Sequence, residues 1–157
     1  MKILFIRPNK DAFGFKPIGI SLLSAICQAQ GHIVSLFDTT FFDFGFEEYT
    51  VTGSRINKYK PIDWSGYNVE KKKCDLKQEL IEALKRFQPD ICSVSLLSDE
   101  RFIAEEISKY TREYSPDIQI IWGGIYPTIA ADTLIHQDYI DYICIGEGIE
   151  VSYPEII

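Results

Sequence analysis

The chain has 157 residues, of which 46% are hydrophobic and 25% are charged, and its formal net charge at pH 7 is −7. This length fits one domain with a substantial core, and the composition argues against a disordered or fibrous protein. The negative charge argues against nucleic acid as the main partner, because binding to phosphates needs clustered lysine and arginine. No uncharged apolar run is long enough to cross a bilayer, and the first eight residues have the pattern of a strand rather than that of a signal peptide. We therefore expect a cytoplasmic protein without a membrane partner.

The chain begins with a strand–helix–strand pattern. Residues 2–7 and 33–37 are short apolar runs, as expected for strands that are covered on both faces. Between them, residues 17–31 have the proline start and the glycine stop of a helix. The apolar stripe of this helix would begin with Ile18 and Leu22.

Three more strand patterns follow, at residues 91–97, 118–122 and 142–145. Helices separate them: one begins after Asp75, a second begins near Asp99, and a short third one lies around residues 129–135. The predicted buried face of the second helix consists of Ile103, Ile107, Tyr110 and Tyr114.

Five strand patterns separated by helices predict a doubly wound α/β domain. It would be a Rossmann or flavodoxin-like five-stranded parallel sheet in three α/β/α layers, formed by residues 1–157. Residues 41–73 are too long for an ordinary connection and are rich in aromatic side chains, which favours a lid or an interface over a plain loop. The last residues begin another amphipathic pattern without a stop signal, so we expect the chain to be the N-terminal part of a longer polypeptide.

Two strand patterns run directly into glycines, which indicates a ligand site. Gly123 and Gly124 follow one strand, and Gly146 and Gly148 follow the next. The carboxyl ends of parallel strands are where open α/β sheets bind ligands, and a missing Cβ lets a flat ligand approach the backbone. The predicted slot also includes Ser95, Leu97 and Ser98. The alternative is that the adjacent glycines only form a tight turn.

Motifs for several other functions are absent from the sequence. The first loop has neither the glycine pattern of a dinucleotide site nor a phosphate-loop lysine, and the acidic residues of a phosphorylated receiver domain are missing. No nucleophile is paired with a base, so we predict no catalytic residue. The four cysteines lack the close spacing of metal ligands, so we predict no metal site.

Short motifs follow one another along the chain in a specific order. They are Pro-x-Gly-hydrophobic at 17–20, Gly-His-x-Val at 31–34, Pro-Asp-hydrophobic at 89–91 with Ser-x-Leu at 95–97, Gly-Gly-x-x-Pro-Thr at 123–128, and Gly-Glu-Gly-x-Glu at 146–150. This series resembles the N-terminal cobalamin-binding domain of cobalamin-dependent radical SAM enzymes. The resemblance covers nearly everything except the aromatic insertion.

The resemblance implies a cobalamin site at the carboxyl ends of the strands. The corrin ring would lie over these ends, the nucleotide tail would lie beside the serines and glycines at 95, 98, 123 and 124, and the loops at 7–15 and 146–150 would face the ring. The implied cofactor-binding residues are Pro8, Asn9, Ser95, Leu97, Ser98, Gly123, Gly124, Tyr126, Pro127, Thr128, Gly146, Glu147 and Gly148.

The resemblance places the catalytic chemistry outside this chain. Such enzymes hold a four-iron cluster with a CxxxCxxC motif, which this chain lacks. S-adenosylmethionine and the cluster would therefore bind to a radical SAM domain after Ile157 or on a separate chain. The parent would be a methyltransferase or a ring-modifying enzyme in which cobalt relays a methyl group, and the fragment alone would be inactive. Two alternatives remain: a cofactor-free docking or substrate-recognition domain of the same fold, and a flavodoxin-like binder of a small molecule.

The first loop lacks the histidine that ligates cobalt in other cobalamin domains. Those domains carry Asp-x-His-x-x-Gly after the first strand, whereas here Asp11 is followed by Phe13, and Lys16 stands at the glycine position. His32 and His136 are expected at the opposite edge of the sheet. The resemblance therefore implies cobalamin bound without a histidine lower ligand.

Overall fold

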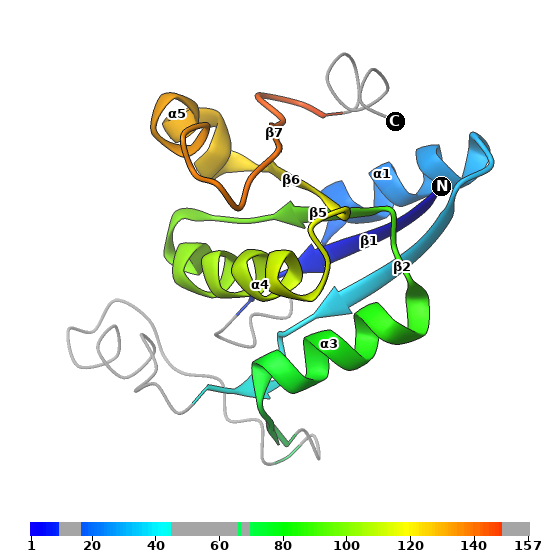
Figure 1. Cartoon of the computed structure of the whole chain (residues 1–157), viewed down its shortest axis with the longest axis vertical. Coiled ribbons are helices and arrows are strands. Elements are labelled where there is room, and N and C mark those ends of the chain that lie inside the picture. Colours follow the sequence, from blue (N-terminus) through cyan, green and yellow to red (C-terminus); the bar gives the residue numbers. More distant parts are fainter. Residues whose placement is uncertain (10–16, 45–65, 67–69, 149–157) are drawn as a thin grey trace.

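The main sheet of the described residues is parallel and has helices on both faces (Figure 1). The computed structural model describes residues 1–9, 17–44, 66 and 70–148. The strands of the sheet are β1 (Lys2–Arg7), β2 (Ile33–Asp38), β5 (Ile91–Ser95), β6 (Gln119–Gly123) and β7 (Tyr142–Ile143). They lie in the order β2-β1-β5-β6-β7, and every neighbouring pair is parallel. This confirms the predicted doubly wound α/β sheet, and the order is the flavodoxin-like one.

The helices alternate with the strands along the chain. They are α1 (Ile18–Ala29), α3 (Leu76–Phe87), α4 (Arg101–Tyr114) and α5 (Ile125–Leu134), and a 3-10 turn, η2 (Ser98–Glu100), precedes α4. In Figure 1, α3 and α4 lie on the near side of the sheet, and α1 lies behind it. Asp75 caps α3 as predicted, because its carboxylate accepts the backbone N–H groups of Lys77 and Gln78 at 2.9 and 3.3 Å. α5 begins earlier than predicted, directly after the paired glycines.

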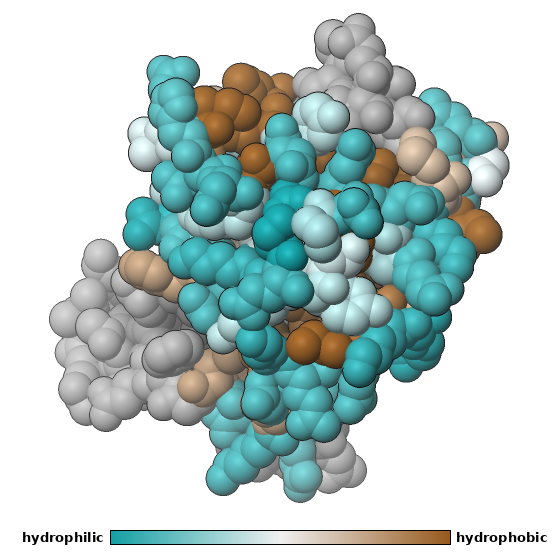
Figure 2. Space-filling view, in the orientation of Figure 1, coloured by the Kyte–Doolittle hydropathy of each residue, from teal (hydrophilic) through white to brown (hydrophobic). Residues whose placement is uncertain are grey.

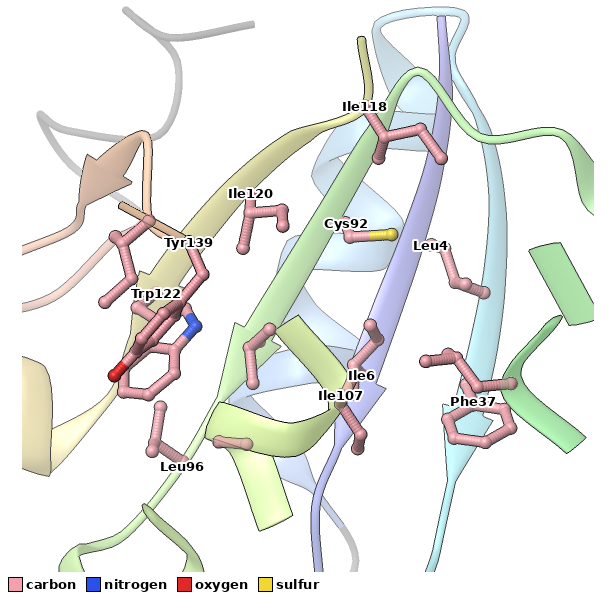
Figure 3. Packing of buried hydrophobic residues seen from close by; sticks show 14 of the residues in the cluster. Leu4, Ile6, Phe37, Cys92, Leu96, Ile107, Ile118, Ile120, Trp122 and Tyr139 are labelled. Carbon is pink, nitrogen blue, oxygen red and sulfur yellow. The ribbon is translucent and has the colours of Figure 1, made fainter. Parts of the chain in front are cut away.

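The sheet separates two hydrophobic cores, because β1 sends alternate side chains to opposite faces. Ile3 and Phe5 belong to the core under α1. Leu4 and Ile6 belong to the larger core under α3 and α4, which Figure 3 shows from close by. All four side chains are at most 1% exposed. The continuous apolar run at 3–6 is therefore explained by a strand that is covered on both faces.

One helix buries a different face from the predicted one, and a second matches its prediction at three of four positions. In α1, Ile20 and Cys27 are buried, whereas Ile18 and Leu22 are 76% and 44% exposed. With Leu23, the buried residues follow the spacing i, i+3 and i+7, which is a second apolar stripe of the same helix. In α4, Ile103 and Ile107 are buried as predicted, and Tyr110 is half-buried against the core. Tyr114 is exposed, and smaller side chains at 104, 108 and 111 are buried as well. Small side chains let this helix lie close to the sheet.

The two ends of the predicted insertion lie side by side. Strands β3 (Phe42–Asp43) and β4 (Lys72–Lys73) pair in parallel, and the N–H of Lys72 donates to the carbonyl of Phe41 at 2.7 Å. Phe42 packs edge-on against Phe37 of β2, with ring centroids 5.8 Å apart. Most of the aromatic segment lies outside the described residues, as do the last residues of the chain, so the expected lid or interface stays a prediction.

Hydrophobic side chains also reach the surface at α5. Figure 2 shows an apolar area at the upper left, over this helix. Ile125 and Ile129 are 63% and 72% exposed there. Among the described residues, no helix has the length and apolar character needed to cross a bilayer.

Candidate functional site

A cavity of about 390 Å³ opens at the carboxyl ends of β5, β6 and β7, beside the start of α1. Its lining consists of Gly19, Leu23, Ser95, Gly124, Ile125, Thr128, Ile129, Gly146, Glu147 and Gly148. Four of these ten residues are glycines, so backbone forms a substantial part of the wall. The space is therefore available because side chains are missing along three neighbouring parts of the fold.

Gly124 is required by the backbone itself. It links β6 to α5 with φ +104° and ψ −166°, a conformation that is essentially restricted to glycine. An added Cβ would lie 2.8 Å from the carbonyl oxygen of Leu96. The N–H of Leu96 in turn donates to the carbonyl of Gly123 at 3.1 Å. The paired glycines thus let the ends of β5 and β6 approach each other closely.

The other glycines of the cavity leave space for different reasons. Gly146 adopts φ +79° in the turn after β7, and an added Cβ would meet no atom within 4 Å. Gly148 is tighter, because an added Cβ would lie 3.0 Å from the Sγ of Cys144. Gly19 lies in the first turn of α1, has no positive φ, and would also place a Cβ in open space. A side chain at Gly19 would therefore enter the cavity without straining the backbone.

One hydroxyl group joins the two glycine turns. The Thr128 Oγ1 donates to the carbonyl of Gly124 at 2.8 Å and accepts the N–H of Gly146 at 3.0 Å. Ser95 contributes the other hydroxyl group of the lining, at the carboxyl end of β5. Glu147 is the one charged residue among the described lining residues, and it is exposed to solvent. The described wall is otherwise apolar or made of backbone.

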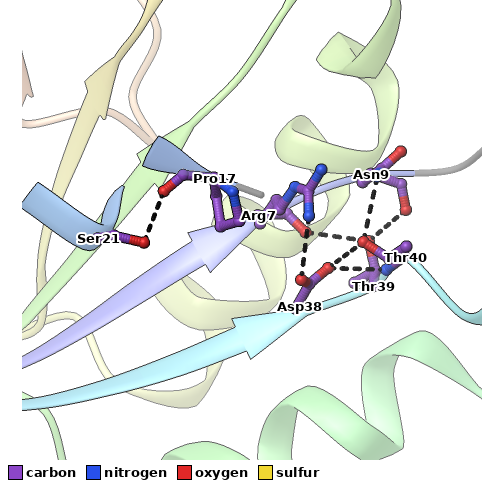
Figure 4. A network of polar contacts seen from close by, with 7 residues as sticks. All are labelled: Arg7, Asn9, Pro17, Ser21, Asp38, Thr39 and Thr40. Atoms are coloured by element: carbon purple, nitrogen blue, oxygen red, sulfur yellow. Dashed lines mark hydrogen bonds and ion pairs between the residues drawn. The ribbon is translucent and has the colours of Figure 1, made fainter. Parts of the chain in front are cut away.

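The carboxyl ends of β1 and β2 are closed by side chains (Figure 4). Asn9 donates from Nδ2 to the Oγ1 of Thr40 at 3.1 Å, and the hydroxyl of Thr39 lies 2.8 Å from the carbonyl of Asn9 and 3.2 Å from that of Arg7. Asp38 accepts the N–H of Thr40 at 2.9 Å and pairs with Arg7 at 3.4 Å. Asn9, Thr39 and Thr40 are buried, so this network fills the edge that the cavity leaves open elsewhere.

A family model for the B12 binding domain matches residues 10–153. The chain belongs to the B12-binding domain family. One relative is the anaerobic magnesium-protoporphyrin IX monomethyl ester cyclase of Cereibacter sphaeroides, which is 33% identical over 75 residues. The match covers 47% of this chain and 12% of the cyclase.

The fold of this B12-binding domain is similar to part of the radical S-adenosylmethionine methyltransferase TsrM from Kitasatospora setae. The structure of TsrM with tryptophan substrate and an S-adenosylmethionine analogue bound has 19% identity and a TM-score of 0.65, over 94% of this chain and 23% of TsrM. A second TsrM structure, with cobalamin and a four-iron, four-sulfur cluster bound, has 18% identity and a TM-score of 0.57, over 85% of this chain and 21% of TsrM. The chain thus spans less than a quarter of the length of these relatives.

The structure brings together six of the residues predicted to bind the cofactor. Ser95, Gly124, Thr128, Gly146, Glu147 and Gly148 line the cavity of the B12-binding domain. The lining does not include Pro8, Asn9, Leu97, Ser98, Gly123, Tyr126 or Pro127. Some of these have partners elsewhere: Leu97 donates its N–H to Glu100 at 2.7 Å, and the hydroxyl of Tyr126 lies 3.5 Å from Arg101. Asn9 belongs to the buried network described above.

Four lining residues of the B12-binding domain were missed by the sequence prediction. They are Gly19, Leu23, Ile125 and Ile129. The glycine of the Pro-x-Gly motif was a usable sign, because a glycine in the first turn of a helix leaves room for a neighbour. The apolar residues carried no such sign, since their spacing is that of any amphipathic helix.

The histidines lie away from the cavity. The Nδ1 of His32 is 3.4 Å from the amino terminus, at the amino end of the sheet. His136 is exposed just after the end of α5. Within the part of the chain that the structure describes, no cluster of three or more His, Cys, Asp or Glu residues could hold a metal ion.

Proposed function

We propose that this chain is the cobalamin-binding module of a radical SAM enzyme of the methyltransferase or ring-modifying type. The observation that carries the proposal is the glycine-lined cavity at the carboxyl ends of β5–β7 in a chain of the B12-binding domain family. Ligands of doubly wound sheets bind at this edge. When bound, cobalamin supplies a cobalt centre that can carry a methyl group.

The residues of the cavity fit one part of the cofactor. The volume of about 390 Å³ lies within the range of about 300–1,000 Å³ that is usual for small-molecule sites. Cobalamin as a whole is larger, so the cavity would hold the flat nucleotide tail while the corrin lies over the strand ends. Leu23 and Ile129 would contact the apolar base, and Ser95 would hydrogen-bond to the polar part of the tail. Glu147 is exposed, so water screens its charge.

We also propose that cobalamin binds with its own benzimidazole displaced and with no histidine in its place. His32 lies at the other end of the sheet from the cavity, beside the amino terminus. An electron paramagnetic resonance spectrum of the cob(II)alamin complex should therefore lack nitrogen superhyperfine splitting from an axial imidazole. Splitting that disappears in His32→Ala or His136→Ala would contradict this proposal.

The catalytic partner in this proposal is a radical SAM domain, either after Ile157 or on a separate chain. The support is that the chain matches only 12% of the cyclase and 23% of TsrM. We expect the purified 157-residue chain to fold without catalysing. Methyl transfer or reductive cleavage of S-adenosylmethionine by this chain alone would contradict the expectation.

The test of cobalamin binding uses Gly19, because a side chain there fills the cavity without straining α1. Hydroxocobalamin is titrated against the wild-type chain and against Gly19→Phe, and binding is followed by visible absorbance. We expect Gly19→Phe to weaken binding at least about tenfold, because a filled pocket does not accept extra volume at low cost. Flavin mononucleotide, titrated in parallel, tests the flavodoxin-like alternative.

The matched control is Gln28→Phe, which adds the same side chain to an exposed position of α1 away from the cavity. It should bind hydroxocobalamin as the wild type does. A wild-type chain that fails to bind at saturating hydroxocobalamin would overturn the proposal in favour of a cofactor-free docking module. Equal affinities for wild type and Gly19→Phe would show that the site lies elsewhere.

A further inference from the structure

We propose that Thr128 is a positioning residue that fixes the turn after β7 against the turn after β6 and so sets the width of the cavity. Its role would be to hold the two walls in register rather than to contact the ligand. This inference rests on the proposed function, because its consequence is a change in cobalamin affinity. Its structural part can be tested without cobalamin.

One oxygen atom, the Oγ1 of Thr128, links three segments of the chain. Thr128 lies in the first turn of α5, and its Oγ1 donates to the carbonyl of Gly124 at 2.8 Å. The same oxygen accepts the N–H of Gly146, eighteen residues further along the chain, at 3.0 Å. The first of these bonds is common for threonine in helices, whereas the second links two separate turns. Both turns contribute glycines to the cavity.

The turn after β7 needs such a link because the strand before it is very short. β7 comprises two residues and, among the strands that the structure describes, pairs with β6 alone. The N–H of Cys144 still donates to the carbonyl of Trp122 at 2.8 Å, which continues the ladder by one bond. Gly146 then turns away with φ +79°, and its missing side chain would have had no neighbour within 4 Å. Packing at Gly146 therefore contributes little to holding this turn in place. The hydrogen bond to Thr128 holds it instead.

The hydroxyl group of Thr128 has little hydrogen-bonding capacity left for a ligand. A hydroxyl group has one proton and two lone pairs. The proton is donated to Gly124, and one lone pair accepts from Gly146. A direct contact with cobalamin would have to use the remaining lone pair, and that lone pair can only accept. The assignment as a positioning residue follows from this use of the hydroxyl group within the chain.

The experiment compares wild type, Thr128→Val and Thr128→Ser. Valine keeps the shape but removes the hydroxyl group, and serine keeps the hydroxyl group. Hydrogen–deuterium exchange of the Gly146 amide, measured by nuclear magnetic resonance without ligand, should become roughly three- to tenfold faster in Thr128→Val and stay near wild type in Thr128→Ser. The amide of Cys144 is the internal reference, since its bond to Trp122 does not involve Thr128. Its exchange should be the same in all three chains.

Hydroxocobalamin titration supplies the second measurement. Thr128→Val should bind about three- to tenfold more weakly than wild type, and Thr128→Ser should restore most of the affinity. The matched control is Thr111→Val in α4. Thr111 makes the same kind of helix bond, to the carbonyl of Ile107 at 2.8 Å, but it does not line the cavity. Once Thr111→Val is shown to be folded, its cobalamin affinity and its Gly146 exchange should match wild type.

The outcomes separate this inference from the proposed function. Unchanged Gly146 exchange in Thr128→Val would overturn the positioning role, whatever happens to affinity. Faster exchange with unchanged affinity would also overturn it, because the link would then not shape the site. If wild type does not bind hydroxocobalamin at all, the proposed function fails. Exchange at Gly146 would then still decide whether Thr128 holds the two turns together.

Discussion

The carboxyl edge of the sheet has two halves that differ in what covers the strand ends. At β1 and β2, the side chains of Asn9, Asp38, Thr39 and Thr40 bond to one another and to the backbone, and three of the four are buried. At β5, β6 and β7, glycines replace side chains and leave a cavity of about 390 Å³. We call these the closed half and the open half.

The difference explains why we propose a ligand site on one side of the edge only. Buried polar groups are tolerated when they are satisfied, and in the closed half they satisfy one another. A ligand entering there would have to break these bonds. In the open half the glycine turns are held mainly by backbone bonds and by one threonine, so a ligand would displace water rather than protein. Mutations in the closed half should therefore change stability, and most of those in the open half should change affinity.

The largest expected effect is an exception within the open half. Gly124→Ala should lower the free energy of unfolding by roughly 3 kcal/mol or more, because its backbone conformation is restricted to glycine and the new Cβ would lie 2.8 Å from the Leu96 carbonyl oxygen. Gly19→Ala, in the same cavity, should be neutral or stabilising by up to about 1 kcal/mol. Urea unfolding measures both. Equal effects of the two substitutions would mean that Gly124 is not conformationally special.

In the closed half, Thr39→Val should destabilise the fold by about 1–3 kcal/mol. Valine fits the volume but leaves the carbonyl of Asn9 without the hydroxyl group that now donates to it at 2.8 Å, in a position that is 0% exposed. Thr39→Ser should recover part of the loss. Thermal unfolding and hydroxocobalamin titration are measured side by side. A variant that loses cobalamin affinity while keeping wild-type stability would break the distinction between the halves.

The smallest expected effect concerns the rate at which buried thiols react with a labelling reagent. Cys144 lies directly beneath Gly148 in the open half, whereas Cys92 lies in β5 within the larger core. Burial raises the pKa of the Cys92 thiol to about 12, so at pH 8 it is almost entirely protonated and unreactive. With maleimide labelling followed by mass spectrometry, we expect Cys144 to react roughly tenfold faster than Cys92 through local opening. Half-buried Cys74 should react before either of them. Equal rates for Cys92 and Cys144 would indicate that the open half opens only together with the larger core.

The sequence predicted the sheet well because each strand is a short apolar run bounded by turn residues. It also indicated the open half, since glycines at the ends of two consecutive strands remove side chains at the edge where such sheets bind ligands. Gly19 was missed although its place in the first turn of a helix was a usable sign, because the distance between a helix and a sheet is set by tertiary packing. Gly124, the position that the motif emphasised, is a poorer target for blocking the cavity than Gly19, because a side chain at Gly124 would strain the backbone and clash with Leu96.

Other contacts at the predicted site residues depend on tertiary structure and could not be predicted. Leu97 and Tyr126 belong to the motifs of the family resemblance, and the N–H of Leu97 and the hydroxyl of Tyr126 bond to Glu100 and Arg101 on the α4 side. The closed half was not predicted either. Asp38 ends β2, with Thr39 and Thr40 after it, and Arg7 ends β1, with Asn9 after it. Only the parallel register of these two strands brings the groups together.

The paired strands β3 and β4 have a consequence for how this domain can change over time. Their pairing holds Asp43 and Lys72 close together, so the segment between these two residues starts and ends at one place on the fold. The entropy of closing a loop grows slowly with its length, by about 0.6 kcal/mol for each doubling. Segments of quite different size could therefore be exchanged at this junction while the rest of the sheet keeps its arrangement. The junction is thus a natural graft point, where evolution or an engineer could replace one appendage by another without redesigning the cofactor edge.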